Sequence, residues 1–382
     1  EDPEIVDGDD HSAGTGWDDC TAIWNEDGKA CFVGTHFADG YKTYLFPMAK
    51  DGKSINRKSA KLIHSGNGRE ANKLIKVGEW YYLVFSEHKP GTGRYVMARR
   101  SKKLFGPYKE EKQLALASRE AMEPNQGGII QGKDGKWYFL THHGTGDWSG
   151  RIVSLLPVIW IDGWPLIGKV LPQQIGTMQW EAPMPAFSSP KLTLLRSDDF
   201  DSEILGPQWQ WNYQPRKDFF SLTERPGWMR LKAFRPIESN QLLKAGNTLT
   251  QRTFRKQDNE VIVKMDISQM ADGQRNGICH FSSHHSALGV VKEGTQYFIE
   301  YRNNGHILKG NEISTSFVWF KTCWGMDGKS QYYYSLDGDN FIQFGEPYQM
   351  VWGNYRGDRI GIYCFNDKSE SGYVDIDYLH YR

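Results

Sequence analysis

Two acidic residues stand at matching places before two similar turns of the chain. Asp19 lies nine residues before Gly28, and Glu70 lies eight residues before Gly78. Two carboxylates that share a site can have unequal pKa values, because the charge of one raises the pKa of the other. Glycoside hydrolysis uses such a pair, with about 6.5–9.5 Å between acid and base when the reaction inverts. On spacing alone, two solvated turn carboxylates are the simpler alternative.

Amide side chains and one further carboxylate precede a third turn of the same kind. The segment EPNQGGII at 123–130 places Glu123, Asn125 and Gln126 shortly before Gly135. These side chains could bind sugar hydroxyls or water. A loop without a binding role is an equal alternative.

Further polar and aromatic candidates lie near the same turns. Arg151 carries a permanent charge and could fork onto two hydroxyls or hold a carboxylate. His142 could donate to a sugar, and His143 is a weak candidate for a metal ligand. Histidines in such places are more often structural. Trp17 could stack on a sugar ring, although most aromatic residues of a β protein belong to the core.

One strand motif that occurs three times must position these residues. It reads EDGKACFVGTHF at 26–37, VGEWYYLVFSEH at 77–88 and DGKWYFLTHHG at 134–144. Its turn glycines are 50 and 57 residues apart, a period that fits one four-stranded blade of a β-propeller. We expect each copy to be an inner strand, so that polar residues at the strand ends share one axial pocket.

The pattern predicts an all-β protein with two domains. Residues 1–180 form the propeller, 181–197 the linker, which contains several prolines, and 198–382 an antiparallel β-sandwich of the jelly-roll type. Three motifs do not close a ring. We expect 144–190 to supply a fourth blade and part of a fifth, and a missing first blade to come from the rest of the gene product or another chain. Residues 109–121 could form a short helix or a connection between blades.

Composition excludes several other classes. The chain has 46 basic and 46 acidic residues, no basic tract and no run of 18 apolar residues, so we expect neither nucleic acid binding nor a membrane span. The opening residues EDPEIVDGDD do not read as a signal peptide. Five cysteines without a CxxC pair make a zinc site improbable and favour buried free thiols, with one disulfide left open.

At these motifs the chain resembles glycoside hydrolase family 43, whose members include β-xylosidases and α-L-arabinofuranosidases. Asp19 to Lys29 is similar to the family motif D-P-x-x-F-x-D-D-D-G-K, with Cys20 in place of proline. Glu70-Ala71-Asn72 stands where the family has E-G-P. Other similar stretches are 98–108, 151–165 and, in the sandwich of family 43 xylosidases, 198–215 and 221–233.

The resemblance implies a five-bladed propeller followed by a concanavalin-like sandwich, and an inverting hydrolysis by three carboxylates. Glu70 would be the general acid, and Asp19 would raise its pKa and orient it. Arg151 would contact the sugar. The general base is normally an aspartate of the first blade, which this sequence lacks. Asp2 looks similar to it, but Asp2 and Asp19 are only 17 positions apart.

The resemblance also bears on cofactors. Family members often hold a calcium ion or a water cluster on the axis, with a histidine ligand in a G-H-x stretch. This chain has Asn125-Gln126-Gly127-Gly128 there. We expect no required cofactor and a structural Ca²⁺ only as an option.

The expected function is exo-acting hydrolysis of β-xylosidic or α-L-arabinofuranosidic bonds in plant cell-wall polysaccharide. Two alternatives stay open, namely a carbohydrate-binding or inactive relative without the general base, and a galactose-directed enzyme of the same family. The polymeric substrate suggests a secreted or periplasmic protein.

Overall fold

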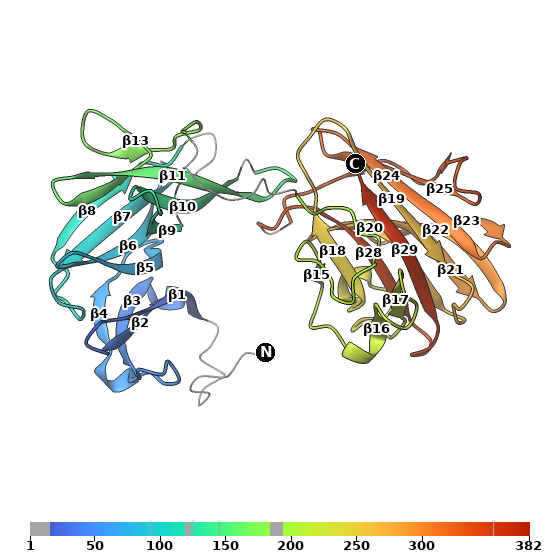
Figure 1. Ribbon diagram of the computed structural model, residues 1–382, viewed down its shortest axis with the longest axis horizontal. Helices are drawn as coiled ribbons and strands as arrows, with labels where there is room; N and C mark the ends of the chain where they lie inside the picture. The colour runs from blue at the N-terminus through green and yellow to red at the C-terminus, as the bar shows by residue number, and fades with distance from the viewer. Residues whose placement is uncertain are drawn as a thin grey trace. The chain divides into compact units, whose positions relative to one another are not determined.

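A computed structural model describes residues 16–91, 93–118, 124, 126–144, 146–183, 194–353 and 355–382, without the side chain of Asp18. Contacts divide the chain into two units. The first comprises residues 1–145 and 151–189, and the second comprises residues 146–150 and 190–382. Both are built from strands (Figure 1). No helix of the described ranges is long and apolar enough to span a membrane.

Three sheets make up the first unit, and each has a core of four antiparallel strands that are consecutive in the sequence. The first contains β1 (Trp17–Trp24), β2 (Ala30–His36), β3 (Lys42–Met48) and β4 (Lys61–His64). The second contains β5 (Glu70–Val77), β6 (Trp80–Lys89), β7 (Gly93–Ser101) and β8 (Glu110–Ala115). The third contains β9 (Gly127–Gln131), β10 (Trp137–Gly144), β11 (Arg151–Ile161) and β12 (Trp164–Ile167). Two 3-10 turns, η2 (Phe37–Asp39) and η3 (Arg57–Ser59), flank β3.

The repeated motif builds the second strand of each sheet, so its assignment to the inner strand was wrong. The motif forms β2, β6 and β10, whereas β1, β5 and β9 are the edge strands. β5 lies beside β1 and β9. The motif was conspicuous because a strand covered on both sides needs a more apolar sequence than an edge strand. Asp19 and Glu70 lie on the edge strands that meet.

Residues 144–190 do not supply a fourth blade within the described part. β11 and β12 complete the third sheet, and β13 (Lys169–Val170) and β14 (Gly176–Thr177) then extend the second sheet. Gly168 permits this return, since its φ is +75° and a Cβ there would lie 2.0 Å from the Thr177 carbonyl oxygen. Residues 110–115 form β8 rather than a helix, and Arg99 and Arg100 pair with two of its glutamates.

Hydrophobic cores hold neighbouring sheets together. Val33 and Leu45 of the first sheet pack with Leu83 of the second. Val84 of the second sheet packs with Phe139 of the third.

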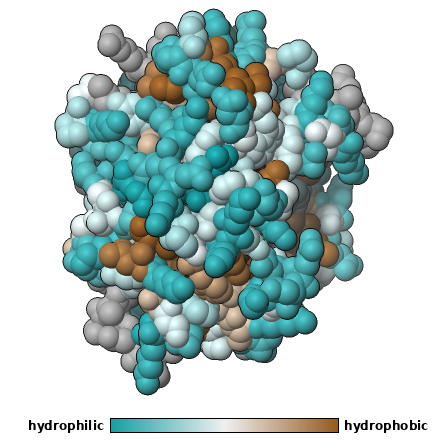
Figure 2. Space-filling view, turned by 90° about the vertical axis from the view of Figure 1, so that its left-hand side faces the viewer, coloured by the Kyte–Doolittle hydropathy of each residue, from teal (hydrophilic) through white to brown (hydrophobic). Residues whose placement is uncertain are grey.

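Hydrophobic side chains form separate patches among hydrophilic ones on the side of the molecule drawn in Figure 2.

The second unit is an antiparallel sandwich, as expected. One sheet has the order β15-β18-β28-β20-β21-β22-β23, and the other has the order β16-β17-β29-β19-β24-β25-β26, with β27 also paired to β25. A single large cluster of apolar side chains from both sheets fills the space between them. The strands of the first sheet are β15 (Gln210–Trp211), β18 (Thr248–Arg252), β20 (Gln274–Phe281), β21 (His285–Glu293), β22 (Gln296–Asn303), β23 (His306–Ile313) and β28 (Arg359–Asn366). Those of the second are β16 (Phe220–Ser221), β17 (Met229–Lys232), β19 (Asn259–Asp266), β24 (Phe317–Trp324), β25 (Lys329–Ser335), β26 (Ile342–Gln343), β27 (Tyr348–Gln349) and β29 (Tyr373–Tyr381), and the 3-10 turns are η4 (Lys217–Phe219) and η5 (Leu242–Lys244).

The five-residue segment 146–150, which connects β10 to β11, belongs to the second unit. Trp148 is 3% exposed and lies in the core of the sandwich. Its indole N–H donates to the Met326 carbonyl at 3.2 Å, and the Asp358 N–H donates to its carbonyl at 2.8 Å. Asp147 forms an ion pair with Arg255.

All five cysteines are free thiols, so the disulfide left open by the sequence does not form. Cys31, Cys279 and Cys364 are buried, and burial raises the pKa of each thiol. Cys20 is exposed and Cys323 is half-buried, so the expected burial holds for three of them.

His64 makes the first unit sensitive to acid. Burial, assisted by the charges of Arg69 and Arg99, lowers its pKa to about 3, while the unfolded chain has a histidine pKa of about 6.5. Between about pH 6.5 and pH 3, His64 is therefore protonated in the unfolded state but neutral in the folded state. The free energy of unfolding should fall by about 1.4 kcal/mol per pH unit through this residue, down to about pH 3. Urea denaturation at pH 7, 6, 5 and 4 measures the slope, and His64→Gln should flatten it; equal slopes in the two proteins would contradict the prediction.

Candidate active site

Asp19 lies in a β-bulge of the inner edge strand of the first sheet. The pairing of β1 with β2 shifts between Asp18 and Thr21, and Asp19 has a φ of +52°. Its Oδ2 accepts a hydrogen bond from the Ala71 N–H at 2.9 Å and another from Gln126 Nε2 at 3.3 Å. One carboxylate oxygen thus joins residues from the first strand of the second sheet and the start of the third. The three sheets converge here.

Glu70 lies at a matching bulge of the second sheet. The pairing of β5 with β6 shifts between Glu70 and Lys73, and Ala71 has a φ of +62°. Bulges re-aim side chains at sheet edges and often lie next to active sites. The peptide N–H that follows Glu70 donates to the Asp19 carboxylate, so Asp19 lies against the backbone of the second bulge.

A buried polar cluster fixes this second bulge to the first sheet. The amide of Asn72 donates to Thr35 Oγ1 at 2.5 Å and to Thr43 Oγ1 at 3.3 Å, and all three residues are fully buried. Asn72 stands where the family motif has proline. A proline ring would restrict the backbone at this position, whereas the Asn72 side chain holds it by hydrogen bonds to the first sheet.

Replacing Ala71 by glycine should stabilise the protein. A left-handed φ costs a non-glycine residue about 1–2 kcal/mol, whereas glycine loses about 0.5–1 kcal/mol more backbone entropy on folding. Ala71 has a φ of +62°, so the difference of the two terms gives a net gain of about 0–1.5 kcal/mol in urea denaturation. Ala98→Gly, in the extended strand β7, is the matched control and should destabilise. A loss of stability in both variants would mean that the left-handed backbone at Ala71 carries no strain.

Arg94 of β7 forms an ion pair with the second carboxylate, with 2.5 Å between Nη1 and Glu70 Oε1. The side chains of Glu70 and Arg94 are 14% and 27% exposed. The same guanidinium nitrogen lies 3.4 Å from Ser86 Oγ and 3.3 Å from the Gly68 carbonyl oxygen. A cation this close favours the ionised form of a carboxyl group.

The third sheet adds Gln126 and His142. Gln126 Oε1 lies 3.5 Å from His142 Nε2, and the Gln126 carbonyl accepts a hydrogen bond from the Thr141 hydroxyl. Gln126 therefore links Asp19 to His142. Arg151 pairs with Gly144 where β10 ends and β11 begins, at the same end of the sheet as Gln126, and it is half-buried.

Comparison with known proteins identifies the family of the chain. Residues 11–165 match the glycosyl hydrolases family 43, and residues 197–382 match the beta xylosidase C-terminal concanavalin A-like domain. The chain belongs to glycosyl hydrolase family 43.

Relatives and a solved structure give the extent of the likeness. The chain is 29% identical to a beta-xylosidase of Formosa agariphila, over 95% of the chain and 69% of that protein. It is 30% identical to a non-reducing end alpha-L-arabinofuranosidase of Bacteroides ovatus, over 44% of the chain and 33% of that protein. A bifunctional GH43-CE structure of Bacteroides eggerthii aligns with a TM-score of 0.81 and 27% identity, covering 96% of the chain. The chain spans 48% of that structure, about half its length.

Not every expected residue of this family 43 chain is brought to the carboxylates. Trp17 is 38% exposed and packs on His36, Tyr44 and Phe46, with ring centroids 4.9–5.9 Å away. Its described ring contacts are thus within the first sheet. Asp2, Glu123 and Asn125 lie outside the described residues.

His143 has structural partners. Its Nδ1 lies 2.5 Å from Ser154 Oγ, its ring meets Trp180 edge-on at 5.2 Å, and burial lowers its pKa. The described residues contain no group of three or more His, Cys, Asp or Glu side chains that could hold a metal ion.

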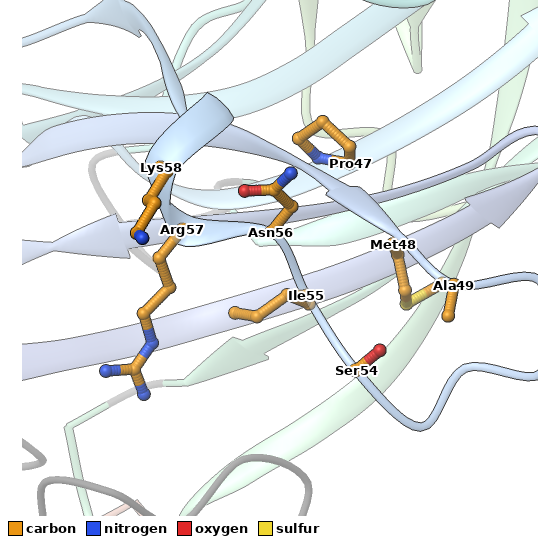
Figure 3. A pocket seen from close by; sticks show the side chains of 8 residues that line it. All are labelled: Pro47, Met48, Ala49, Ser54, Ile55, Asn56, Arg57 and Lys58. Atoms are coloured by element: carbon orange, nitrogen blue, oxygen red, sulfur yellow. The ribbon is translucent and has the colours of Figure 1, made fainter.

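The cavity drawn in Figure 3 is separate from the carboxylates. Its lining residues include Pro47, Asn56 and Arg57, and its volume is about 570 Å³. Met48, also in its lining, pairs with Ala30 at the end of the first sheet opposite to Asp19.

Arg94 is the residue of the site that the sequence did not indicate. It precedes the stretch at 98–108 that resembles the family, and no motif marks it. The available signal was a basic residue six places after His88, at the end of the repeated strand. Without the strand register, this spacing does not indicate a contact with Glu70.

Proposed function

We propose that this chain is the main part of an exo-acting, inverting glycosidase that cleaves β-xylosidic or α-L-arabinofuranosidic bonds of plant polysaccharides. The observation that carries the proposal is the junction of the two bulges, where Asp19 binds the peptide that follows Glu70. Family membership supports hydrolysis. The beta-xylosidase and arabinofuranosidase relatives support the two sugar classes.

Each residue of the site has a proposed role. Glu70 protonates the leaving glycosidic oxygen. Asp19 holds the second bulge in place, and its negative charge helps Glu70 keep its proton. Arg151, Gln126 and His142 supply hydrogen bonds to the hydroxyls of the sugar.

The general base is proposed to lie on a further sheet, contributed by the rest of the gene product or by another chain. Two faces could receive such sheets. The face of the third sheet that does not pack on the second exposes aliphatic side chains, Val153 at 74% among them. The first sheet exposes Trp17 beside Tyr44. Exposed apolar faces of this kind mark interaction surfaces.

One observation favours a second candidate, a carbohydrate-binding protein without hydrolysis. The ion pair with Arg94 favours ionised Glu70, whereas an acid catalyst must be protonated.

A polymeric substrate supports a secreted or periplasmic location, which we propose on that ground alone.

The deciding experiment is hydrolysis of aryl β-xyloside and aryl α-L-arabinofuranoside by this chain and by a version extended N-terminally by one blade. Activity of the extended version only, with release of the inverted anomer seen by NMR, would support the proposal. Activity of this chain alone would place the base within it. Binding to xylan by both versions without hydrolysis would favour the carbohydrate-binding protein.

A further inference from the structure

We propose that Arg94 is a positioning residue for Glu70, which holds the carboxyl group in the site and determines the pH range in which it carries a proton. The catalytic meaning of this inference rests on the proposed function. The contact itself does not.

Strand register brings Arg94 to Glu70. Glu70 pairs with Ser86 on β6, and Arg94 pairs with His88 two residues further along the same strand. Ser86 and Val84 are two residues apart on β6, so their side chains share one face of the sheet. This face packs against the third sheet. Arg94 thus reaches diagonally across β6 to the carboxyl group of an edge strand.

Arg94 lies closer to Glu70 than to its other polar contacts. The ion pair measures 2.5 Å, whereas the contacts with Ser86 and Gly68 measure 3.3–3.4 Å. The neighbouring Arg69 is engaged elsewhere, since it pairs with Glu87 and Glu111. The half-buried setting makes the interaction stronger than it would be in bulk water.

Opposing charges act on Glu70 from the elements packed around it. Asp19 of β1 favours the protonated form, and Arg94 favours the ionised form. The balance between them decides whether Glu70 can serve as an acid near neutral pH. Charged and titratable groups on these elements also include Lys73 and Lys76 of β5, His36 of β2, Glu87 and His88 of β6, and His142 of β10, and Arg69 directly precedes β5.

The test compares Arg94→Gln with Arg94→Lys by carboxyl ¹³C NMR of glutamate-labelled protein, with Glu70→Gln identifying the signal. Removing the cation should move the titration midpoint of Glu70 upward by about 1 pH unit or more. Lysine keeps the charge and should leave the midpoint near that of the unaltered protein. Arg99→Gln, which breaks the Arg99–Glu111 pair in the same sheet, is the matched control and should leave the titration midpoint of Glu70 unchanged. An unmoved midpoint in Arg94→Gln overturns the inference.

Activity adds a second readout. The high-pH limb of the kcat/KM profile should move upward with the midpoint in Arg94→Gln, while KM changes little. If the titration midpoint of Glu70 shifts in Arg94→Gln but the protein hydrolyses no substrate, the proposed function is wrong and the coupling between Arg94 and Glu70 is confirmed. A moved midpoint with an unmoved limb would show that Arg94 does not act on catalysis.

Discussion

Glu70→Gln should slow the hydrolysis of xylo-oligosaccharides by about 10²–10⁴-fold, the usual contribution of a general acid. Glutamine matches glutamate in size but has no proton to give to the leaving oxygen. An aryl glycoside with an acidic phenol needs little protonation, so its hydrolysis should fall much less. The measurement is kcat/KM on both substrates, with the catalytically competent form of the protein.

The control is Glu110→Gln, which removes an equivalent carboxylate from β8, where it pairs with Arg100. It should leave both rates near those of the unaltered protein. Equal losses on the two substrates for Glu70→Gln would mean that Glu70 is not the acid.

Trp148→Ala should lower the free energy of unfolding of the second unit by about 3–5 kcal/mol, as expected for removal of a large buried aromatic side chain. Trp148 lies in the main core cluster, and its ring fills the space beside Gly328, where a Cβ would come within 2.2 Å. The loss also leaves the Met326 carbonyl without its indole donor.

Hydrogen exchange of the strands β24 and β28 reports on this unit directly. Their amides should exchange faster in Trp148→Ala, in proportion to the lost stability. Trp24→Ala removes a tryptophan that is 51% exposed in the first unit and should leave β24 and β28 unchanged. Equal protection in the two variants would mean that the Trp148 side chain does not stabilise the sandwich.

The sequence by itself identified the two carboxylates and the all-β architecture. Asp19 and Glu70 were recognisable because they lie nine and eight residues before the turn glycines of two strands of the same pattern. That distance is a local property, since it follows from the length of the edge strand and its turn. Alternating side chains and turn glycines likewise predicted the sandwich, because a period of two reflects burial of one face of each sheet.

Only the tertiary structure decided which strand lies at the inner edge and what surrounds the carboxylates. The repeated motif was taken for the inner strand, but strand pairing places it second in each sheet. Arg94 reaches Glu70 through the register of three strands. Trp148 sits in the sequence between propeller strands and yet packs in the sandwich core. Such contacts depend on segments far apart in the chain, for which neither spacing nor composition carries a local signal.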